Sequence, residues 1–184
     1  SPFTDVVAGS WYFDAALYAS SHNLMLGTSP TEFSPNITMT RGMLVTVLYR
    51  MNGSPSVSGK TPFTDVRTDE WYSAAVLWAY QNGIVTGMSD TTFDPINNVT
   101  REQMATILFR YTKTAAPDKA KASADLSGFA DAGSVNDWAV DAMRWAVGQK
   151  LIAGITLEQS VYLQPRGNAT RAQAATVLTR YYAQ

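Results

Sequence analysis

The sequence predicts an all-α protein in which three helix-loop-helix repeats form a pseudo-threefold assembly with a central three-helix bundle. Three observations lead to this prediction. One series of motifs occurs three times along the chain, each copy carries two apolar patterns with helical spacing, and a single copy is too small to bury both. With 184 residues, of which 46% are hydrophobic and 16% charged, the chain is long enough for one shared core.

The repeats are visible as short motifs that return in a fixed order. Each copy begins with Phe-x-Asp and continues with a tryptophan, an apolar stretch ending in glycine, an aromatic residue shortly before a proline, and a Thr-Arg pair that begins five residues after that proline. We place copy 1 at 1–53, copy 2 at 63–113 and copy 3 at 128–184. The connectors 54–62 and 114–127 are rich in Ser, Gly, Pro, Ala and Lys, which is typical of surface linkers.

The first helix of each copy is expected to begin near its tryptophan. In copy 2, Asp69 or a neighbour is the expected N-cap and Gly83 is the expected C-terminal stop. Trp71, Ala75 and Trp78 have the i, i+4, i+7 spacing of one helix face. We therefore expect these three residues to share one side of the helix, and the equivalent residues of copies 1 and 3 to do the same.

A second helix is expected to begin at each Thr-Arg pair. Thr100 with Gln103, and Thr170 with Gln173, have capping-box spacing, whereas Thr40 lacks the glutamine. Apolar residues follow at offsets 4, 7, 8 and 11 from each threonine: Leu44, Val47, Leu48 and Met51; Met104, Ile107, Leu108 and Tyr111; Ala174, Val177, Leu178 and Tyr181. This is an amphipathic pattern, so we expect the three second helices to meet around the pseudo-threefold axis and to leave three clefts between copies.

The composition excludes several classes of function. The chain has no cysteine and only one histidine, His22, so disulfides, thiolate catalysis and multi-histidine metal sites are excluded. Fourteen Lys+Arg against fifteen Asp+Glu leave no chain-wide basic footprint for nucleic acid. No apolar run is long enough for a transmembrane helix, and the acids are too scattered to nominate a glycosidase pair. We therefore expect no catalytic residues, no metal and no cofactor.

The arginine directly after each cap threonine is the first candidate ligand group: Arg41, Arg101 and Arg171. A cation at this end of a helix is disfavoured by the macrodipole, by about a few tenths of a kcal/mol, yet all three copies have one. Either the guanidinium and the free helix N–H groups form an anion site, or the arginine is paired with a nearby acid. By contrast, Arg50, Arg110 and Arg180 lie near helix C-termini, where a cation is favoured and no functional role is needed.

Three further repeated positions complete the candidate site. The tryptophans Trp11, Trp71 and Trp138 either stack on sugar rings beside the arginines or pack in the core. The acids Asp5, Asp65 and Asp131 are the candidate ion-pair partners of the arginines, and otherwise turn residues or ligand contacts. The glycines Gly27, Gly87 and Gly154 indicate a positive φ or a close approach of the backbone, to packed side chains or to a ligand.

In this order the motifs resemble the S-layer homology family. In copy 2, for example, these motifs are Phe63-Thr64-Asp65-Val66, Trp71, Gly87, Phe93-Asp94-Pro95 and Thr100-Arg101. The resemblance covers three tandem modules and nearly the whole chain. The family's Thr-Arg-Ala-Glu motif lacks its glutamate in all three copies, and copy 3 has an enlarged loop before Tyr162. These departures predict that the three clefts differ in affinity.

The resemblance implies a non-catalytic anchor on the surface of Gram-positive bacteria, in the cell wall or S-layer. Its implied partner is a secondary cell wall polysaccharide, often bearing pyruvate ketals, held in inter-module grooves. The implied contacts are the motif arginines with the acidic sugar, and the tryptophans and aspartates as groove walls. A protein–protein assembly module of a surface layer stays open as the alternative. Because the chain opens on Ser1 with no signal peptide, we expect a mature segment or an excised piece of a larger surface protein.

Overall fold

The computed structural model describes all residues 1–184 and is mostly helical, as predicted. Its six α-helices are α1 (Phe13–Ser21), α2 (Arg41–Met51), α3 (Ser73–Gln81), α4 (Arg101–Ala115), α5 (Val140–Gly148) and α6 (Arg171–Tyr182). Three short 3₁₀ turns lie at Pro117–Lys119, Ala132–Ser134 and Asp137–Ala139. None of the helices has the length and apolar character needed to cross a membrane.

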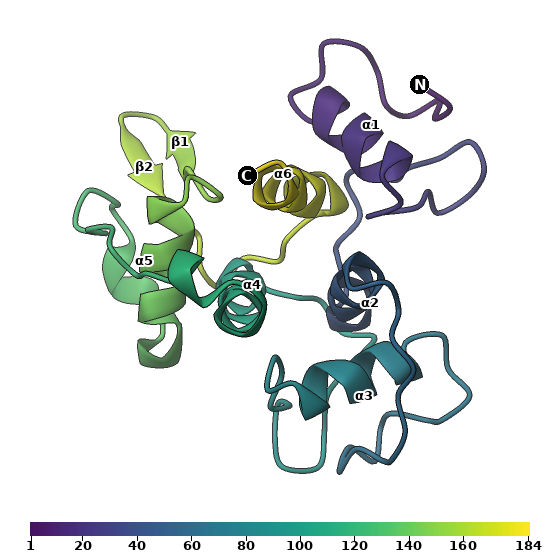
Figure 1. Ribbon diagram of the computed structural model, residues 1–184. Helices are drawn as coiled ribbons and strands as arrows, with labels where there is room; N and C mark the ends of the chain where they lie inside the picture. Colours follow the sequence, from purple (N-terminus) through teal and green to yellow (C-terminus); the bar gives the residue numbers. More distant parts are fainter.

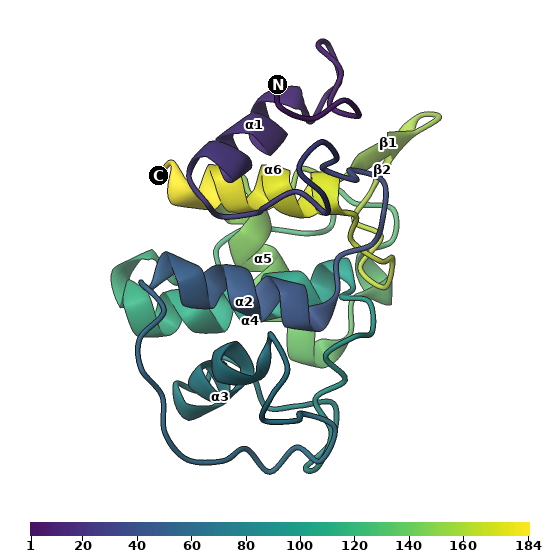
Figure 2. The ribbon, with the colours of Figure 1, turned by 90° about the vertical axis from the view of Figure 1, so that its right-hand side faces the viewer.

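The helices form two layers around a pseudo-threefold axis. Figure 1 looks along this axis, with α2, α4 and α6 around the centre and α1, α3 and α5 outside them. Figure 2 shows from the side that α2 and α4 run next to each other along the axis. The predicted arrangement of three inner and three outer helices is therefore present.

Each outer helix packs against the inner helix of a different copy. Helix α3 of copy 2 contacts α2 of copy 1, α5 of copy 3 contacts α4 of copy 2, and α1 contacts α6 at the other end of the sequence (Figure 1). Each packed pair of one inner and one outer helix therefore combines two different repeats of the sequence. The first and last helices of the chain close the assembly upon each other.

A cycle of backbone hydrogen bonds joins the three copies just before the inner helices. Met39 N donates to Ala169 O at 2.8 Å, Ala169 N donates to Val99 O at 2.9 Å, and Val99 N donates to Met39 O at 2.9 Å. All three residues are buried. Each copy thus gives one bond to a neighbour and receives one from the other neighbour, so the cycle has no open position.

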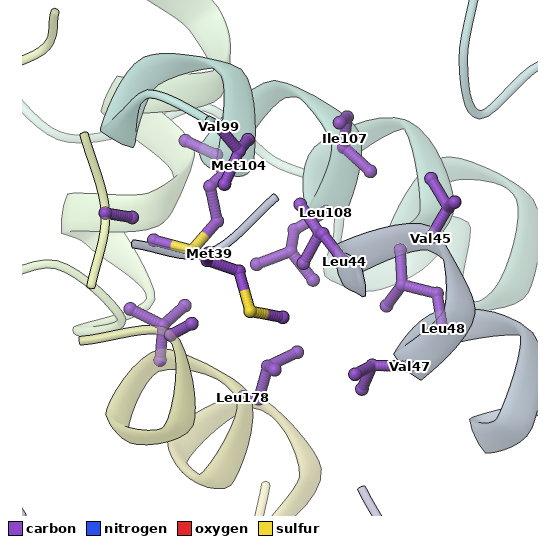
Figure 3. Close-up of a cluster of buried hydrophobic side chains, with 14 of the residues drawn as sticks. Met39, Leu44, Val45, Val47, Leu48, Val99, Met104, Ile107, Leu108 and Leu178 are labelled. Atoms are coloured by element: carbon purple, nitrogen blue, oxygen red, sulfur yellow. The ribbon is translucent and has the colours of Figure 1, made fainter. Parts of the chain in front are cut away.

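The inner helices share one apolar core, which Figure 3 shows in close-up. Leu44, Leu48, Leu108 and Leu178 point toward the axis and are fully buried. These residues belong to the predicted offsets 4 and 8, and the residues at offset 7 are buried as well. Burying one such side chain contributes about 1.5–3 kcal/mol, but only the three copies together provide the surfaces that cover it.

The outer helices begin later than the sequence suggested. Helix α3 starts two residues after Trp71, and its N-cap residue Tyr72 makes no side-chain capping bond. Asp69, the expected cap, instead pairs with Arg67 at the surface. Ala75 is buried but Trp71 is exposed, so the predicted common face is wrong for the tryptophan, which lies in the turn before the helix. That turn is held by the Ser73 hydroxyl, whose single proton is shared between the backbone carbonyls of Arg67 and Glu70.

The inner helices begin as predicted. The threonine caps are in place, and both expected capping boxes, Thr100 with Gln103 and Thr170 with Gln173, are complete. The enlarged loop of copy 3 adds a feature that the all-α prediction did not include. Strand β1 (Ile155–Leu157) pairs antiparallel with β2 (Ser160–Tyr162) in a small hairpin.

Candidate functional site

Each motif arginine is buried and reaches from its own copy to the next one. Arg41 Nε donates to Phe93 O at 2.8 Å, Arg101 Nε donates to Leu163 O at 2.7 Å, and Arg171 Nε donates to Phe33 O at 2.9 Å. The acceptors are backbone carbonyls of the loop before the next inner helix. One edge of each guanidinium therefore joins two copies.

The first N–H groups of the inner helices are not free. Arg41 N donates to Asn97 O at 3.0 Å, Gly42 N donates to Pro95 O at 2.7 Å, and the next N–H is bound by the Thr40 side chain. The other two inner helices have the equivalent bonds. The expectation of free helix N–H donors is therefore wrong, because a loop of the neighbouring copy covers each helix end. The helix ends therefore offer no free N–H to an anion, whereas the guanidinium groups carry a positive charge.

The repeated aspartates hold the same loops. Asp65 accepts hydrogen bonds from Phe93 N at 2.9 Å and from Asp94 N at 2.7 Å. Asp5 and Asp131 accept the equivalent pairs of backbone bonds in their own copies. None of them forms an ion pair with a motif arginine, since the one ion pair of the structure joins Arg67 to Asp69. The aspartates therefore shape turns, and the direct salt bridge weighed as the alternative does not form.

The charge of the motif arginines is only weakly compensated. Burial lowers the pKa of Arg41 because low-dielectric surroundings disfavour the cation, while Asp94 and Asp65 act in the opposite direction. The positive charge of Arg110 lowers the pKa of Arg41 further. Burial likewise lowers the pKa of Arg101 and Arg171. Two cations of different copies thus lie close together without an acid in contact.

Two grooves each contain one motif arginine. The first, of ≈ 350 Å³, is lined by Arg41, Val85, Thr86, Gly87, Met88, Gln103, Thr106, Ile107, Arg110 and Trp138. The second, of ≈ 520 Å³, is lined by the corresponding residues one copy further on: Arg101, Leu151, Ile152, Ala153, Gly154, Ile155, Gln173, Thr176, Val177, Arg180 and Trp11. Each groove therefore takes its arginine, its glycine turn and its tryptophan from three different copies. Neither contains a carboxylate.

The structure brings together some predicted site residues and not others. Arg41, Gly87 and Trp138 meet in the first groove, and Arg101, Gly154 and Trp11 meet in the second. Their third equivalents, Arg171, Gly27 and Trp71, line none of the four principal cavities, and neither do the three repeated aspartates.

Arg110 lines the first groove and Arg180 lines the second. The sequence did not single out either arginine as a candidate ligand group. Their position near helix C-termini was expected to account for them without a functional role. The available signal was their recurrence ten residues after the cap in every copy. That signal became meaningful only when the structure placed α4 and α6 opposite an arginine of the preceding copy.

The motif tryptophans are surface residues. Trp11, Trp71 and Trp138 are 67%, 57% and 54% exposed, whereas Trp145 is 1% exposed. In copies 1 and 2 the ring meets the following tyrosine edge to face, at 5.3 Å for Trp11 and 5.1 Å for Trp71. The core-packing interpretation of these three tryptophans is therefore wrong, and their rings are free to stack on a ligand.

A buried acid supports the segment before Trp138. In copy 3 the spacing between the Phe-x-Asp motif and the tryptophan is one residue longer than in the other two copies. Glu102 of copy 2 is 2% exposed and accepts hydrogen bonds from the backbone N–H of Asn136, at 3.0 Å, and from its side-chain amide. The corresponding residues Gly42 and Ala172 cannot make this contact. Glu102 thus fixes the start of the segment that carries a groove wall.

The comparisons with known proteins agree on one family. The sequence profile of the S-layer homology domain matches residues 2–42, 62–105 and 128–175. An endoglucanase of Bacillus sp. (strain KSM-635) is 33% identical over 97% of this chain, which corresponds to 18% of that protein. The surface-layer 125 kDa protein of Lysinibacillus sphaericus is 31% identical over 84% of this chain and 12% of its own length. An amylopullulanase of Thermoanaerobacterium thermosulfurigenes is 28% identical over 96% of this chain and 9% of its own length. The chain spans less than a fifth of each of these relatives.

Proposed function

This chain belongs to the S-layer homology family, and from that premise we propose that it is a non-catalytic anchor for an anionic secondary cell wall polysaccharide. The family associates it with the bacterial cell wall or S-layer. The proposed binding sites are the two grooves of Arg41 and Arg101, and the proposed acidic group is a pyruvate ketal. The endoglucanase and the amylopullulanase suggest that such segments accompany enzymes, and we propose that this one holds a larger protein at the cell surface.

One observation carries the proposal. Arg41 uses only its Nε in hydrogen bonding within the protein, so both Nη groups are left as donors beside a groove that contains Arg110 and no acid. A planar guanidinium binds a carboxylate through two parallel hydrogen bonds. The same geometry holds for Arg101 in the second groove. The aspartates take the indirect role of holding the loops beside these grooves, while Gly87 and Gly154 form part of the groove lining.

The groove walls suit a sugar. The exposed Trp138 offers an aromatic face to the apolar C–H side of a pyranose ring, while Thr86 and Gln103 offer hydrogen-bonding groups to its polar rim. In the second groove Trp11 and Gln173 take these places. Because a polysaccharide presents many copies of one unit, two modest sites engaged together retain the protein far more strongly than one.

The test is calorimetry with purified secondary wall polymer, before and after mild acid removes its ketal groups. We expect binding by the intact polymer and no heat from the treated one, because the arginines lose their charged partner. Retained binding to the treated polymer, or to periodate-oxidised wall, would instead support the protein-assembly alternative. Release of reducing sugar by the purified segment would contradict a non-catalytic role.

A further inference from the structure

The C-terminal ends of the inner helices carry another repeated set of side chains, at offset 11 from the cap threonines: Met51, Tyr111 and Tyr181. Asn52 Nδ2 donates to the Tyr111 hydroxyl at 2.9 Å, and the hydroxyls of Thr112 and Tyr181 are hydrogen-bonded to each other at 3.1 Å. In both pairs the residue at offset 12 of one copy bonds the tyrosine of the next copy. The third step of this cycle, from Tyr182 to Met51, is missing because methionine has no hydroxyl group.

A cavity of ≈ 200 Å³ lies where this step is missing. All three copies contribute to its walls, with Met51, Tyr111, Trp145, Gln149, Tyr181 and Tyr182 among the lining residues. The Tyr182 ring lies beside Tyr18 instead, at 6.3 Å between ring centroids, and the residue is 48% exposed. The cavity therefore occurs in the one position of the cycle where a tyrosine is replaced by a methionine.

The Tyr111 hydroxyl has an unused proton. Its oxygen accepts the bond from Asn52, but its O–H donates to no group of the protein, and only 8% of the residue is exposed. A buried donor is normally satisfied by the protein, by water or by a ligand. The half-buried Gln149 uses its backbone carbonyl to accept from Gln184, whereas its side-chain amide makes no bond within the protein. The cavity thus offers an O–H donor and an amide group to a guest molecule.

The remaining walls of the cavity are apolar and aromatic. The Tyr181 ring lies between those of Tyr111, at 5.9 Å, and Trp145, at 6.4 Å, and Met51 adds a thioether. No acidic side chain lines the cavity, and Lys119, its one charged residue, is exposed. Helices α2, α4 and α6 all end here, and the partial negative charge of their carbonyl ends disfavours an anion. The cavity therefore suits a neutral group with an apolar part and a hydrogen-bond acceptor.

We infer that this cavity binds the acetamido group of an N-acetylated sugar, at a site separate from the two grooves. Its volume is below the about 300–1,000 Å³ of pockets for drug-sized ligands, so it takes one small group. The acetamido carbonyl accepts the Tyr111 proton, and its N–H donates to the side chain of Gln149. Its methyl group packs against Met51 and Trp145. The pyranose ring lies at the rim, with its C–H face on the exposed ring of Tyr182.

The first test is NMR of the unmodified protein, with the Met51 methyl group and the Trp145 indole N–H as reporters. Both lie outside the two grooves. Methyl N-acetyl-β-D-glucosaminide should shift both signals, with half-saturation at about a millimolar, as expected for a ligand of this size. Methyl β-D-glucopyranoside, which has the same ring without the acetamido group, should shift neither.

Three outcomes of this titration would overturn the inference. Equal shifts with the two sugars would remove the acetamido group from recognition. A response to N-acetylglycinamide as strong as that to the acetylated sugar would assign the cavity to acetylated peptides instead. No shift at about 20 mM of the acetylated sugar would leave the Tyr111 proton to water alone.

The second test uses three variants and the Trp145 indole signal. Met51→Tyr supplies the missing third tyrosine and fills the cavity, so it should abolish the response while the helical CD signal persists. Tyr111→Phe keeps the ring and removes the donor, which should weaken binding about tenfold. Tyr49→Phe is the matched control, because its hydroxyl donates to Pro55 O outside the cavity. Undiminished binding by the Met51 variant, or equal losses in the two phenylalanine variants, would contradict the site.

Discussion

Arg41 and Asp65 hold the same residue, Phe93, from opposite sides. The guanidinium donates to its carbonyl at 2.8 Å, and the carboxylate accepts from its amide at 2.9 Å. Arg101 with Asp131 and Arg171 with Asp5 repeat this arrangement on Leu163 and Phe33. The opposite charges thus act together through a peptide backbone without touching. This explains why an arginine stands where the helix macrodipole disfavours a cation.

The first prediction concerns Asp65. Asp65→Asn replaces an acceptor of two charge-assisted bonds with an amide that must turn an N–H toward one backbone donor. We expect the free energy of unfolding to fall by about 1–3 kcal/mol in urea titrations. Asp69→Asn removes an exposed ion-pair partner and should change it by less than about 0.5 kcal/mol. Equal effects of the two substitutions would contradict the role of Asp65 in the loop.

The second prediction separates two arginines at equivalent helix positions. Arg110→Gln removes a cation from the first groove, whereas Arg50→Gln removes an exposed one at the matching position of α2. Loss of a charged hydrogen bond corresponds to about tenfold weaker binding, in the first groove, of a pyruvylated hexoside, that is, a methyl hexopyranoside with a 4,6-pyruvate ketal. The Arg50 variant should bind like the unmodified chain. Calorimetry with matched protein concentrations checks this, and similar losses in both variants would count against the groove assignment.

The third prediction contrasts two tryptophans of copy 3. Trp138→Ala should abolish binding in the first groove and leave thermal unfolding nearly unchanged, because the ring is exposed. Trp145→Ala should cost about 3–5 kcal/mol of stability, since this ring is buried and its Nε1 donates to Lys119 O at 2.9 Å. Differential scanning calorimetry and the hexoside titration together make the comparison. A large stability loss in the Trp138 variant would assign that ring to packing instead.

The fourth prediction concerns Glu102. Glu102→Ala copies the residue of copy 3, Ala172, and leaves the backbone N–H of Asn136 without its acceptor, at a cost of about 1–3 kcal/mol. The first groove should bind more weakly because Trp138 loses its support. The second groove, whose Trp11 is not held by this acid, is the internal control. NMR titration resolves the two grooves, and an equal decline in both would point to general destabilisation.

The fifth prediction is a pH profile. Burial lowers the pKa of Arg41 and Arg101 below the ordinary arginine value, so their charge is destabilised in the fold, but a guanidinium stays protonated through the neutral range. No histidine or acid lines either groove. Wall binding should therefore be constant between about pH 5 and pH 9 and fall below about pH 3.5, as the ligand carboxylate takes up a proton. Sedimentation with purified wall measures this, and a transition near pH 6.5 would contradict it.

The inner helices could be predicted because their signals are local. Thr100 and Gln103 are three residues apart, and the apolar offsets lie on one helix, so periodicity and capping chemistry identify them without tertiary information. Trp71 was misplaced because its spacing from Ala75 continued a helical pattern across a turn. The hydroxyl bonds of Ser73 that form this turn have no periodic signature.

The site depended on contacts between distant residues. That Asn97 and Pro95 cover the first N–H groups of α2 requires a loop more than fifty residues away in the sequence. Arg41 and Arg110 line one groove because copies 1 and 2 pack against each other, and no local pattern in the sequence indicates this packing. The difference between Gly27 and Gly87 was not predictable, because both are glycines in similar surroundings and yet only Gly87 has a positive φ.

The hydrogen-bonded cycle of Met39, Ala169 and Val99 also fixes the number of repeats. An open stack of repeats exposes an unused face at each end, and it can lengthen by one unit at a time. A closed cycle has no unused donor or acceptor, so a fourth copy would find no position in it. Tandem duplication of such a segment therefore yields a second complete unit of three, and a count that is not a multiple of three leaves copies with unsatisfied edges.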